Sequence, residues 1–230
     1  MRRNSGEIMP SSDCSERVYQ NVGNQELLKL VSGFPPGRAL DCGCGAGDNA
    51  RALSSSGWEV VGVTISPAEE EKASRYCTQV YLRDLESGLP PDVSGGFNLI
   101  VFSHVLEHIR NPSRVLQEAR KVLAPGGRIA VALPNILFWR CRLEFVFGRF
   151  EYEESGLMDN THVHFYTYIS GKRLLEDNGF QLIKSTVEGS FPLRPLRRIM
   201  PGAANFIDGI ACKLWPGCFG HQLLYIAELR

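Results

Sequence analysis

Apolar runs alternate with helical patterns along most of this chain. Short apolar and β-branched runs, which lack the polar alternation of a half-exposed strand, predict buried strands at residues 38–42, 58–63, 79–83, 97–102 and 128–133. Between them, apolar residues recur at helical spacing over residues 15–31, 48–56 and 112–123, and a serine, a proline and a run of glutamates from Ser66 begin another helix. This order predicts an α/β, doubly wound parallel sheet with helices on both faces.

The alternation stops after residue 133 and returns late in the chain. A helix over residues 170–178 and strands over 180–187 and 222–229 are still predicted. Two segments without clear periodicity, residues 134–167 and 188–220, are far longer than the usual connection of about 4–6 residues. We expect a single domain over residues 1–230 in which these two excursions form a cap or lid.

Composition narrows the class of protein. The 230 residues include 25 basic and 25 acidic side chains, and 43% are apolar, so a sizeable core is possible and the balanced charge argues against a nucleic-acid partner. No apolar run approaches the roughly 18 residues of a membrane span, and the N-terminus lacks the apolar stretch of a signal peptide. We therefore expect a cytoplasmic protein without a membrane span, whose oligomeric state is open.

The cysteines do not follow a metal-binding pattern. Cys42 and Cys44 are separated by one residue, and none of the seven cysteines belongs to a CxxC pair. His104 and His108 lie four residues apart, but a zinc pair would need a third ligand that nothing nearby in the sequence supplies. No metal is expected, and the thiols are expected to be reduced and mostly buried.

A glycine-rich turn joins the first predicted strand to the helix after it. Residues 40–47 read LDCGCGAG, and such a turn lets the backbone approach a ligand near the N-terminus of a helix. The pattern is G-x-G-x-G, whereas a nicotinamide-dinucleotide fold has G-x-G-x-x-G and an acid about 20 residues later for the ribose. Thr64 stands at the ribose position here, so a nicotinamide enzyme is disfavoured.

An ordered series of motifs resembles those of the class I S-adenosylmethionine-dependent methyltransferases. The matching sequences are LDCGCGAG (40–47), VGVTISP (61–67), RDL (83–85), FNLI (97–100), SHVLEH (103–108) and LAPGG (123–127). GRFEY (148–152) and THVHFYT (161–167) are similar to a subgroup related to ubiquinone-type and methionine-biosynthesis-type methyltransferases. The resemblance implies a Rossmann-like seven-stranded sheet, mostly parallel with an antiparallel last strand, and S-adenosylmethionine as cofactor, with S-adenosylhomocysteine as its product.

The same resemblance implies a cofactor-binding set. Its members are Asp41, Gly43, Gly45, Gly47, Thr64, Glu69, Asp84, Leu85, Ser103 and His104. The glycine turn would approach the methionine part of the cofactor, with Asp41 orienting the turn or reaching the ammonium group. Thr64 and Glu69 would bind the ribose, where the family usually has an acid in place of the threonine. The adenine would contact the Asp84 carboxylate and the backbone N–H of Leu85. Ser103 and His104 would lie beside the sulfonium.

Simpler structural explanations remain open for several of these residues. Thr64 is also an ordinary β-branched end of a strand, and Glu69 an acid facing the helix dipole. Asp84 could be a helix cap. For the acceptor, a hydroxyl would benefit from a general base, and the candidates are His104, His162 and His164. Strand-like spacing would place the last two on one face, although structural roles are also open.

The two excursions are expected to choose the methyl acceptor. Asn135, Arg149 and Tyr166 are tentative substrate contacts, and residues 137–147 could also pack as a helix. Basic residues gather in both excursions, either as a solvated face balanced by nearby acids or as a site for an anion: Arg140, Arg142, Arg149, Arg194, Arg197 and Arg198. We expect O-methylation of a hydroxyl or carboxylate on a small, possibly anionic molecule of saccharide or secondary-metabolite type.

Other functions are compatible with the same motifs. A methyltransferase-fold protein that binds the cofactor or a partner without turnover is one alternative, favoured by Thr64 standing where an acid is usual. An N- or C-methyltransferase is another. An RNA or protein methyltransferase is disfavoured by the balanced charge and by the absence of an Asn-Pro-Pro-Tyr type sequence.

Overall fold

A doubly wound sheet forms the centre of the computed structural model, which describes residues 23–230 and leaves the side chain of Arg194 undescribed. The strands of this part of the chain are β1 (Arg38–Cys42), β2 (Glu59–Thr64), β3 (Gln79–Leu82), β4 (Phe97–Ser103), β5 (Leu123–Pro134), β6 (Phe180–Gly189) and β7 (Gly220–Leu229). They form one 7-stranded sheet in the order β3-β2-β1-β4-β5-β7-β6. Strand β7 is antiparallel to both of its neighbours, and the other pairs are parallel. The predicted sheet, including its antiparallel last strand, is confirmed.

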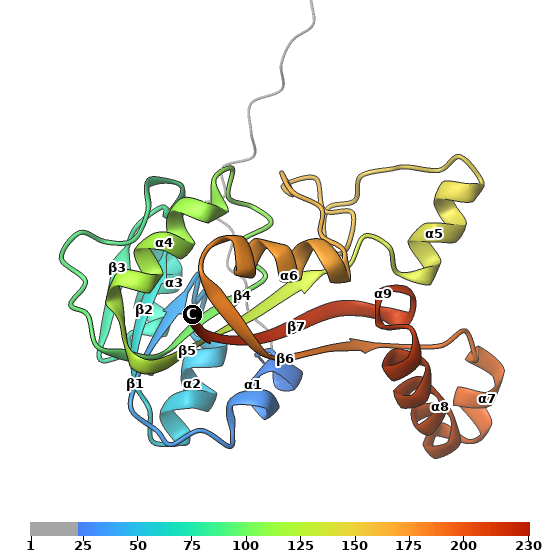
Figure 1. Cartoon of the computed structure of the whole chain (residues 1–230), viewed down its shortest axis with the longest axis horizontal. Helices are drawn as coiled ribbons and strands as arrows, with labels where there is room; N and C mark the ends of the chain where they lie inside the picture. The colour runs from blue at the N-terminus through green and yellow to red at the C-terminus, as the bar shows by residue number, and fades with distance from the viewer. Residues whose placement is uncertain (1–22) are drawn as a thin grey trace, which may run out of the picture.

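Helices cover both faces of this sheet (Figure 1). Those that follow the early strands are α1 (Gln25–Val31), α2 (Asp48–Ser55), α3 (Pro67–Ala73), the 3₁₀ turn η2 (Leu85–Ser87) and α4 (Pro112–Val122). The later ones are α5 (Trp139–Val146), α6 (Tyr168–Asp177), α7 (Arg194–Ile199), α8 (Pro201–Leu214) and α9 (Pro216–Phe219). The predicted leading helix is confirmed from residue 25 onward, and its first part lies outside the described residues. No helix within residues 23–230 is both long and apolar enough to span a bilayer.

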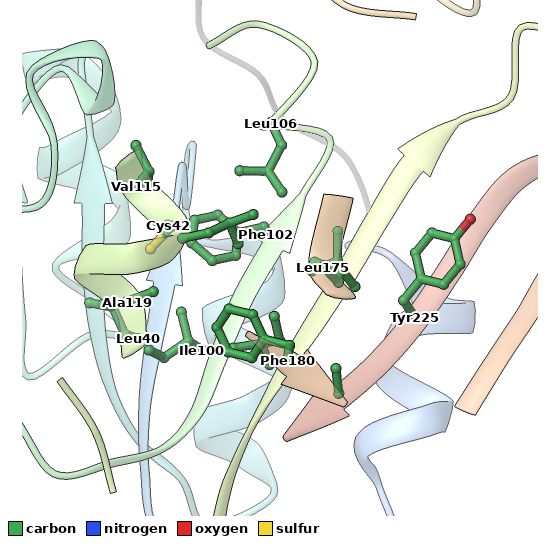
Figure 2. Close-up of a cluster of buried hydrophobic side chains, with 14 of the residues drawn as sticks. Leu40, Cys42, Ile100, Phe102, Leu106, Val115, Ala119, Leu175, Phe180 and Tyr225 are labelled. Atoms are coloured by element: carbon green, nitrogen blue, oxygen red, sulfur yellow. The ribbon is translucent and has the colours of Figure 1, made fainter. Parts of the chain in front are cut away.

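Alternating side chains of the strands build a core on each face. Leu40 and Ile100 point to one side, where Val115 and Leu116 of α4 and Leu175 of α6 cover them. Figure 2 shows this cluster, with Phe102 and Leu106 near the end of β4. The opposite cluster packs α1 and α2 against the other strand faces, through Leu27, Val31, Ala39, Ala50, Leu53 and Val60. Because strands buried on both faces are apolar throughout, their sequences showed no alternation.

Both excursions leave the sheet at the edge that carries the glycine turn. Strands β5 and β6 are each antiparallel to β7, so their ends and the start of β7 lie at the same edge as the end of β1. The first excursion connects β5 to α6 and holds α5, and the second connects β6 to β7 and holds α7, α8 and α9. Figure 1 shows these helices gathered beyond that end of β5 and β7. The topology therefore places the excursions where a ligand of a doubly wound sheet binds.

Candidate functional site

Three glycines in the left-handed region shape the turn after β1. Gly43, Gly45 and Gly47 have φ values of 73°, 54° and 88°. A Cβ on Gly43 would lie 2.5 Å from Cγ2 of Val105, and one on Gly47 would lie 2.9 Å from Cα of Ala73. Glycine is therefore required at both positions by conformation and by space, because the turn is pressed between the end of β4 and α3. This turn lies where the strand order reverses, between β1 and β4.

Asp41 lies directly under this turn as a buried carboxyl group without a partner. Its side chain is 0% exposed, and neither Oδ1 nor Oδ2 has a hydrogen bond to any residue within 23–230. Burial raises the pKa of Asp41 from 3.8 to about 7. A buried carboxylate is costly unless hydrogen-bond donors or a positive charge reach it. This position therefore fits a ligand that brings an amine or ammonium group.

Thr64 and Glu69 are brought together at the end of β2. The hydroxyl of Thr64 donates to Oε2 of Glu69 at 2.6 Å, and both side chains are 3% exposed. Glu69 lies in the first turn of α3, where its charge faces the positive end of the helix. The pair presents an acid at the end of the second strand even though the strand itself ends in threonine.

Asp84 caps a short helical turn after β3. Its Oδ1 accepts a hydrogen bond of 2.9 Å from the backbone N–H of Glu86, at the start of η2. The Asp84 side chain is exposed, whereas that of Leu85 is buried in the core. Asp84 is therefore a helix cap, as the structural alternative for this residue predicted. The cap holds the carboxylate just after β3, the strand that pairs with β2.

His104 stands in a strained conformation at the end of β4. Its φ of 57° is in the left-handed region. Among the described residues, His104 is the only non-glycine residue with a positive φ. The preceding Ser103 accepts a hydrogen bond of 3.1 Å from Nδ2 of Asn24, the cap of α1. A histidine held at positive φ costs about 1–2 kcal/mol, so the surrounding contacts must hold it there.

Two oxygen atoms hold the ring of His104. Its Nδ1 lies 3.2 Å from Oε1 of Glu107, and its Nε2 lies 2.5 Å from Oε1 of Gln222 on β7. Gln222 cannot turn its amide freely, because its Oε1 also accepts from Asn24 and its Nε2 donates to Glu188. Both ring nitrogens therefore act as donors. Burial lowers the pKa of His104, but the hydrogen bond and charge of Glu107 outweigh burial, and the net pKa is raised.

His162 and His164 do not share a face, which corrects the strand-like prediction for this segment. The backbone turns here instead, with the N–H of His162 donating to the Asp159 carbonyl at 3.1 Å. His162 is buried beside His108, with ring centroids 4.8 Å apart. Burial lowers the pKa of His162. His164 instead lies with Nε2 3.0 Å from the carbonyl of Arg110. The two rings thus have different surroundings.

Asn135 and Tyr166 are integral to the framework of the first excursion. Asn135 is 0% exposed; its Nδ2 donates to the carbonyl of Gly220 at 2.7 Å, and its Oδ1 accepts from the N–H of Leu137. Its amide is therefore committed to main-chain groups, which favours a structural role for Asn135 over direct contact with a substrate. Tyr166 belongs to the core cluster, and burial raises the pKa of its phenol.

Some arginines of the excursions make hydrogen bonds within the protein, and others are exposed. Arg197 donates to both carboxylate oxygens of Asp208, at 2.6 and 3.1 Å, and Arg142 donates to the carbonyls of Leu137 and Gly217. Both hold the fold of the excursions. Arg149 remains exposed and lines a hollow of about 160 Å³ on α5, together with Trp139, Arg140, Leu143, Glu144 and Phe147. The sequence did not separate these two groups.

Sequence reasoning assigned no role to Glu107, Gln222 and Asn24. Glu107 is 0% exposed, lies within the motif SHVLEH, and contacts His104, three residues earlier, within the turn that follows β4. The only sequence feature that indicated its burial is the apolar character of the neighbouring residues. Gln222 lies 118 residues from His104 in sequence, so no local pattern could have revealed their contact.

A doubly wound sheet with an antiparallel last strand, and a glycine turn at its switch point, defines the Rossmann-like methyltransferase class of fold. The chain belongs to the methyltransferase domain family, whose sequence pattern matches residues 17–185. A methyltransferase of this fold from Archaeoglobus fulgidus, described as SAM dependent, superposes with a TM-score of 0.62 over 88% of this chain and 91% of that one, at 22% identity.

Curated relatives share only part of their length with this chain. An uncharacterized 37.1 kDa protein in a Streptomyces fradiae transposon is 34% identical over 127 residues, which are 52% of this chain and 35% of that protein. A ubiquinone biosynthesis O-methyltransferase of Psychrobacter cryohalolentis is 26% identical over 127 residues, 52% of this chain and 49% of the relative. The chain thus spans about half or less of the length of each of these two relatives.

Proposed function

We propose that this protein is an S-adenosylmethionine-dependent methyltransferase that methylates an oxygen atom of a small molecule. When bound, S-adenosylmethionine supplies a methyl group on a positively charged sulfur, an electrophile that needs alignment more than covalent catalysis. The observation that carries the proposal is Asp41, whose buried carboxyl oxygens find no partner among the described residues and which directly precedes a turn with three glycines at positive φ. The ammonium group of the cofactor's methionine part would meet that need, directly or through water.

The remaining edge residues fit the other parts of the same cofactor. Glu69 holds a carboxylate beside the Thr64 hydroxyl, which supports ribose binding by the pair. Asp84 is held at the end of the neighbouring β3, which supports a contact with the adenine amine, with the N–H of Leu85 beside it. These residues lie along the ends of β1, β2 and β3, the edge at which doubly wound folds bind nucleotides.

The hydrogen bonds of His104 support an acceptor that is already anionic. Because both ring nitrogens donate to oxygens, His104 holds no lone pair ready to take a proton from a hydroxyl. Its side chain is 42% exposed, so a charged ring at this place could attract and orient a carboxylate. We therefore propose a carboxylate, or another oxygen that is deprotonated before binding, as the methyl acceptor.

The excursions support the same chemistry. They leave the sheet at the end that holds His104, and Arg140 of α5 and Arg149, three residues after this helix, line one hollow that could take an anionic part of the substrate. A protein without turnover was favoured because Thr64 stands where the family usually has an acid. The hydrogen bond from Thr64 to Glu69 supports an enzyme instead, because Glu69 supplies an acid at this place. A cytoplasmic location remains part of the proposal; each cysteine within residues 23–230 is a free thiol.

Transfer of a labelled methyl group tests the proposal. The purified chain would be incubated with methyl-labelled S-adenosylmethionine and matched pairs of small molecules that differ only in carrying a carboxylate or a hydroxyl. We expect base-labile labelled esters from some of the acids, at a rate that does not require deprotonation of His104. Binding of the cofactor without transfer to any acceptor would instead favour the protein without turnover. Label on nitrogen or carbon, or on hydroxyls alone, would contradict the proposed acceptor.

A further inference from the structure

A second cluster of possible ligands lies behind His104. Glu107 and His108, from the turn after β4, meet His162 from the first excursion, and one ligand atom of each lies within 4.8 Å of the others. His162 is more than 50 residues later in the chain than the other two, which is why the sequence offered no third ligand. The cluster is distinct from the glycine turn and its buried carboxyl group.

Two atoms of this cluster are buried and have no partner. Oε2 of Glu107 and Nδ1 of His162 make no hydrogen bond to the part of the chain that the structure describes, although the two residues are 0% and 9% exposed. Buried polar atoms are nearly always satisfied, and leaving one unsatisfied costs about 1–3 kcal/mol. The carboxylate of Glu107 and the imidazole of His162 thus belong to one cluster and each leave a buried polar atom unsatisfied, which indicates a missing shared partner. A cation with affinity for both oxygen and nitrogen meets this requirement.

Neighbouring groups fix the ring of His108 in the form that binds a metal. Nδ1 of His108 lies 3.0 Å from the hydroxyl of Thr161, and that hydroxyl donates to Oδ1 of Asp159 at 2.6 Å. Since the hydroxyl proton goes to Asp159, His108 must carry its proton on Nδ1, which leaves the lone pair on Nε2. Nδ1 of His162 is buried and accepts or donates no hydrogen bond within the described residues, so it is open to an ion. Support of ligand histidines by such outer partners is typical of metal sites.

We propose that Glu107, His108 and His162 bind a divalent transition-metal ion, with Zn²⁺ as the ion that two imidazoles and a carboxylate fit best. Ligand atoms in a tetrahedral zinc site are about 3.4 Å apart, so atoms within 4.8 Å need only small side-chain movements. Magnesium and calcium prefer oxygen ligands and are disfavoured. Three protein ligands leave a fourth position for water. This proposal replaces the sequence-based expectation that the chain binds no metal.

The ion would connect the first excursion to the donor end of the sheet. The backbone already joins them, because the N–H groups of Val163 and His164 both donate to the carbonyl of Glu107. Glu107 would bind the ion through Oε2 while its Oε1 keeps the bond to His104. The ion would therefore stabilise the excursion and fix the carboxylate that orients the His104 ring, and its binding does not depend on the proposed methyl transfer.

Zinc uptake by the full chain tests the site. Chelator-treated protein would be dialysed against dilute Zn²⁺ and its metal content measured, with His162→Gln and Glu107→Gln as site variants and His164→Gln as the matched control from the same loop. We expect about one zinc per chain for the parent and the control, and at least a tenfold lower content for both site variants. A parent without zinc, or site variants with unchanged content, would overturn the proposal.

A spectroscopic measurement protects this test from misfolded variants and from thiol binding. With Co²⁺ in place of Zn²⁺, the parent should show visible ligand-field bands without the near-ultraviolet band of cobalt–thiolate bonds, because the site holds no sulfur. A thiolate band would assign the metal to cysteines and contradict the proposal, whatever the variants do. The thermal midpoint of the parent should also rise with Zn²⁺ and not with Mg²⁺.

Discussion

The hydroxyl of Thr64 donates a 2.6 Å hydrogen bond to Oε2 of Glu69, and both side chains are buried at the carboxyl end of β2. In a strand-to-helix connection of this fold, the end of the second strand is the place of the nucleotide ribose. The pair thus combines an acid from α3 with a hydroxyl from β2, where one strand residue would otherwise supply the acid.

Glu69→Ala should weaken binding of S-adenosylhomocysteine, because the ribose hydroxyls lose an ionised acceptor. Hydrogen bonds to charged groups contribute about 1.5–3 kcal/mol, which corresponds to a loss of affinity of about 10- to 150-fold. Thr64→Ser keeps the hydroxyl and should change affinity by less than about threefold. Calorimetric titration measures both, and an unchanged affinity of the Glu69→Ala protein would remove the pair from the binding site.

Asp41→Asn should stabilise the free protein at alkaline pH. Burial raises the pKa of Asp41 from 3.8 to about 7, so between these values the folded chain binds more protons than the unfolded chain, and stability falls as the pH rises. An amide cannot ionise and avoids this loss. The thermal midpoint of the variant should match that of the parent near pH 3, below both pKa values, and exceed it increasingly up to pH 8. A variant that is equally destabilised at pH 3 and at pH 8 would show that the carboxylate has a partner in the free protein.

Gly43→Ala should destabilise the protein more than Gly126→Ala. Both glycines have left-handed backbones, with φ of 73° and 72°, but a Cβ at Gly43 would lie 2.5 Å from Cγ2 of Val105, whereas one at Gly126 would meet nothing within 4 Å. Backbone strain costs about 1–2 kcal/mol at each, and overpacking adds about 1–3 kcal/mol at Gly43 alone. Urea unfolding measures the difference. Adding Val105→Ala to Gly43→Ala should recover part of the loss; no recovery would contradict the close packing.

His104→Asn should reduce stability in a pH-dependent way. The net pKa of His104 is raised from 6.5, mainly by Glu107, so the protonated ring stabilises the fold fully below its unfolded pKa, and this stabilisation is lost as the pH rises through the folded pKa. The gap in thermal midpoint between parent and variant should be largest near pH 5.5 and shrink above pH 7.5. A gap that grows with pH would mean that the ring is neutral in the folded protein.

Arg197→Ala should loosen the second excursion without affecting cofactor binding. Burial alone would raise the pKa of Asp208, but the paired guanidinium and the N–H of Phe191 hold it below its usual value. Removing Arg197 leaves this half-enclosed carboxylate with fewer donors, so residues 190–219 should be cleaved faster by a protease. Affinity for S-adenosylhomocysteine should stay within about twofold of the parent. Unchanged cleavage would show that the ion pair does not hold the excursion.

The cofactor end of the fold could be predicted because its determinants are local. Strands buried on both faces give continuous apolar runs, and the turn at residues 43–47 needs glycine at positive φ, which is visible in the sequence itself. The pairing of Thr64 with Glu69, five positions apart along one connection, was expected from the family resemblance rather than from the spacing alone.

The acceptor end could not be predicted to the same degree. Gln222 reaches His104, and His162 reaches Glu107, only because β7 and the first excursion return to the end of β4. The spacing of His162 and His164 indicated a strand, but hydrogen bonds to the Glu107 carbonyl bend the backbone instead. Likewise, the sequence could not tell that Arg197 is paired with Asp208 while Arg149 is exposed.

Calorimetric titration of the purified chain with S-adenosylhomocysteine tests the central claim most directly. We predict one binding site per chain with micromolar affinity, which Asp41→Ala weakens by at least about tenfold because the cofactor's ammonium group loses its buried counter-charge. Gly126→Ala, remote from the turn, should bind as the parent does. A folded parent that gives no binding heat at any temperature, or an Asp41→Ala protein that binds equally well, would contradict the account.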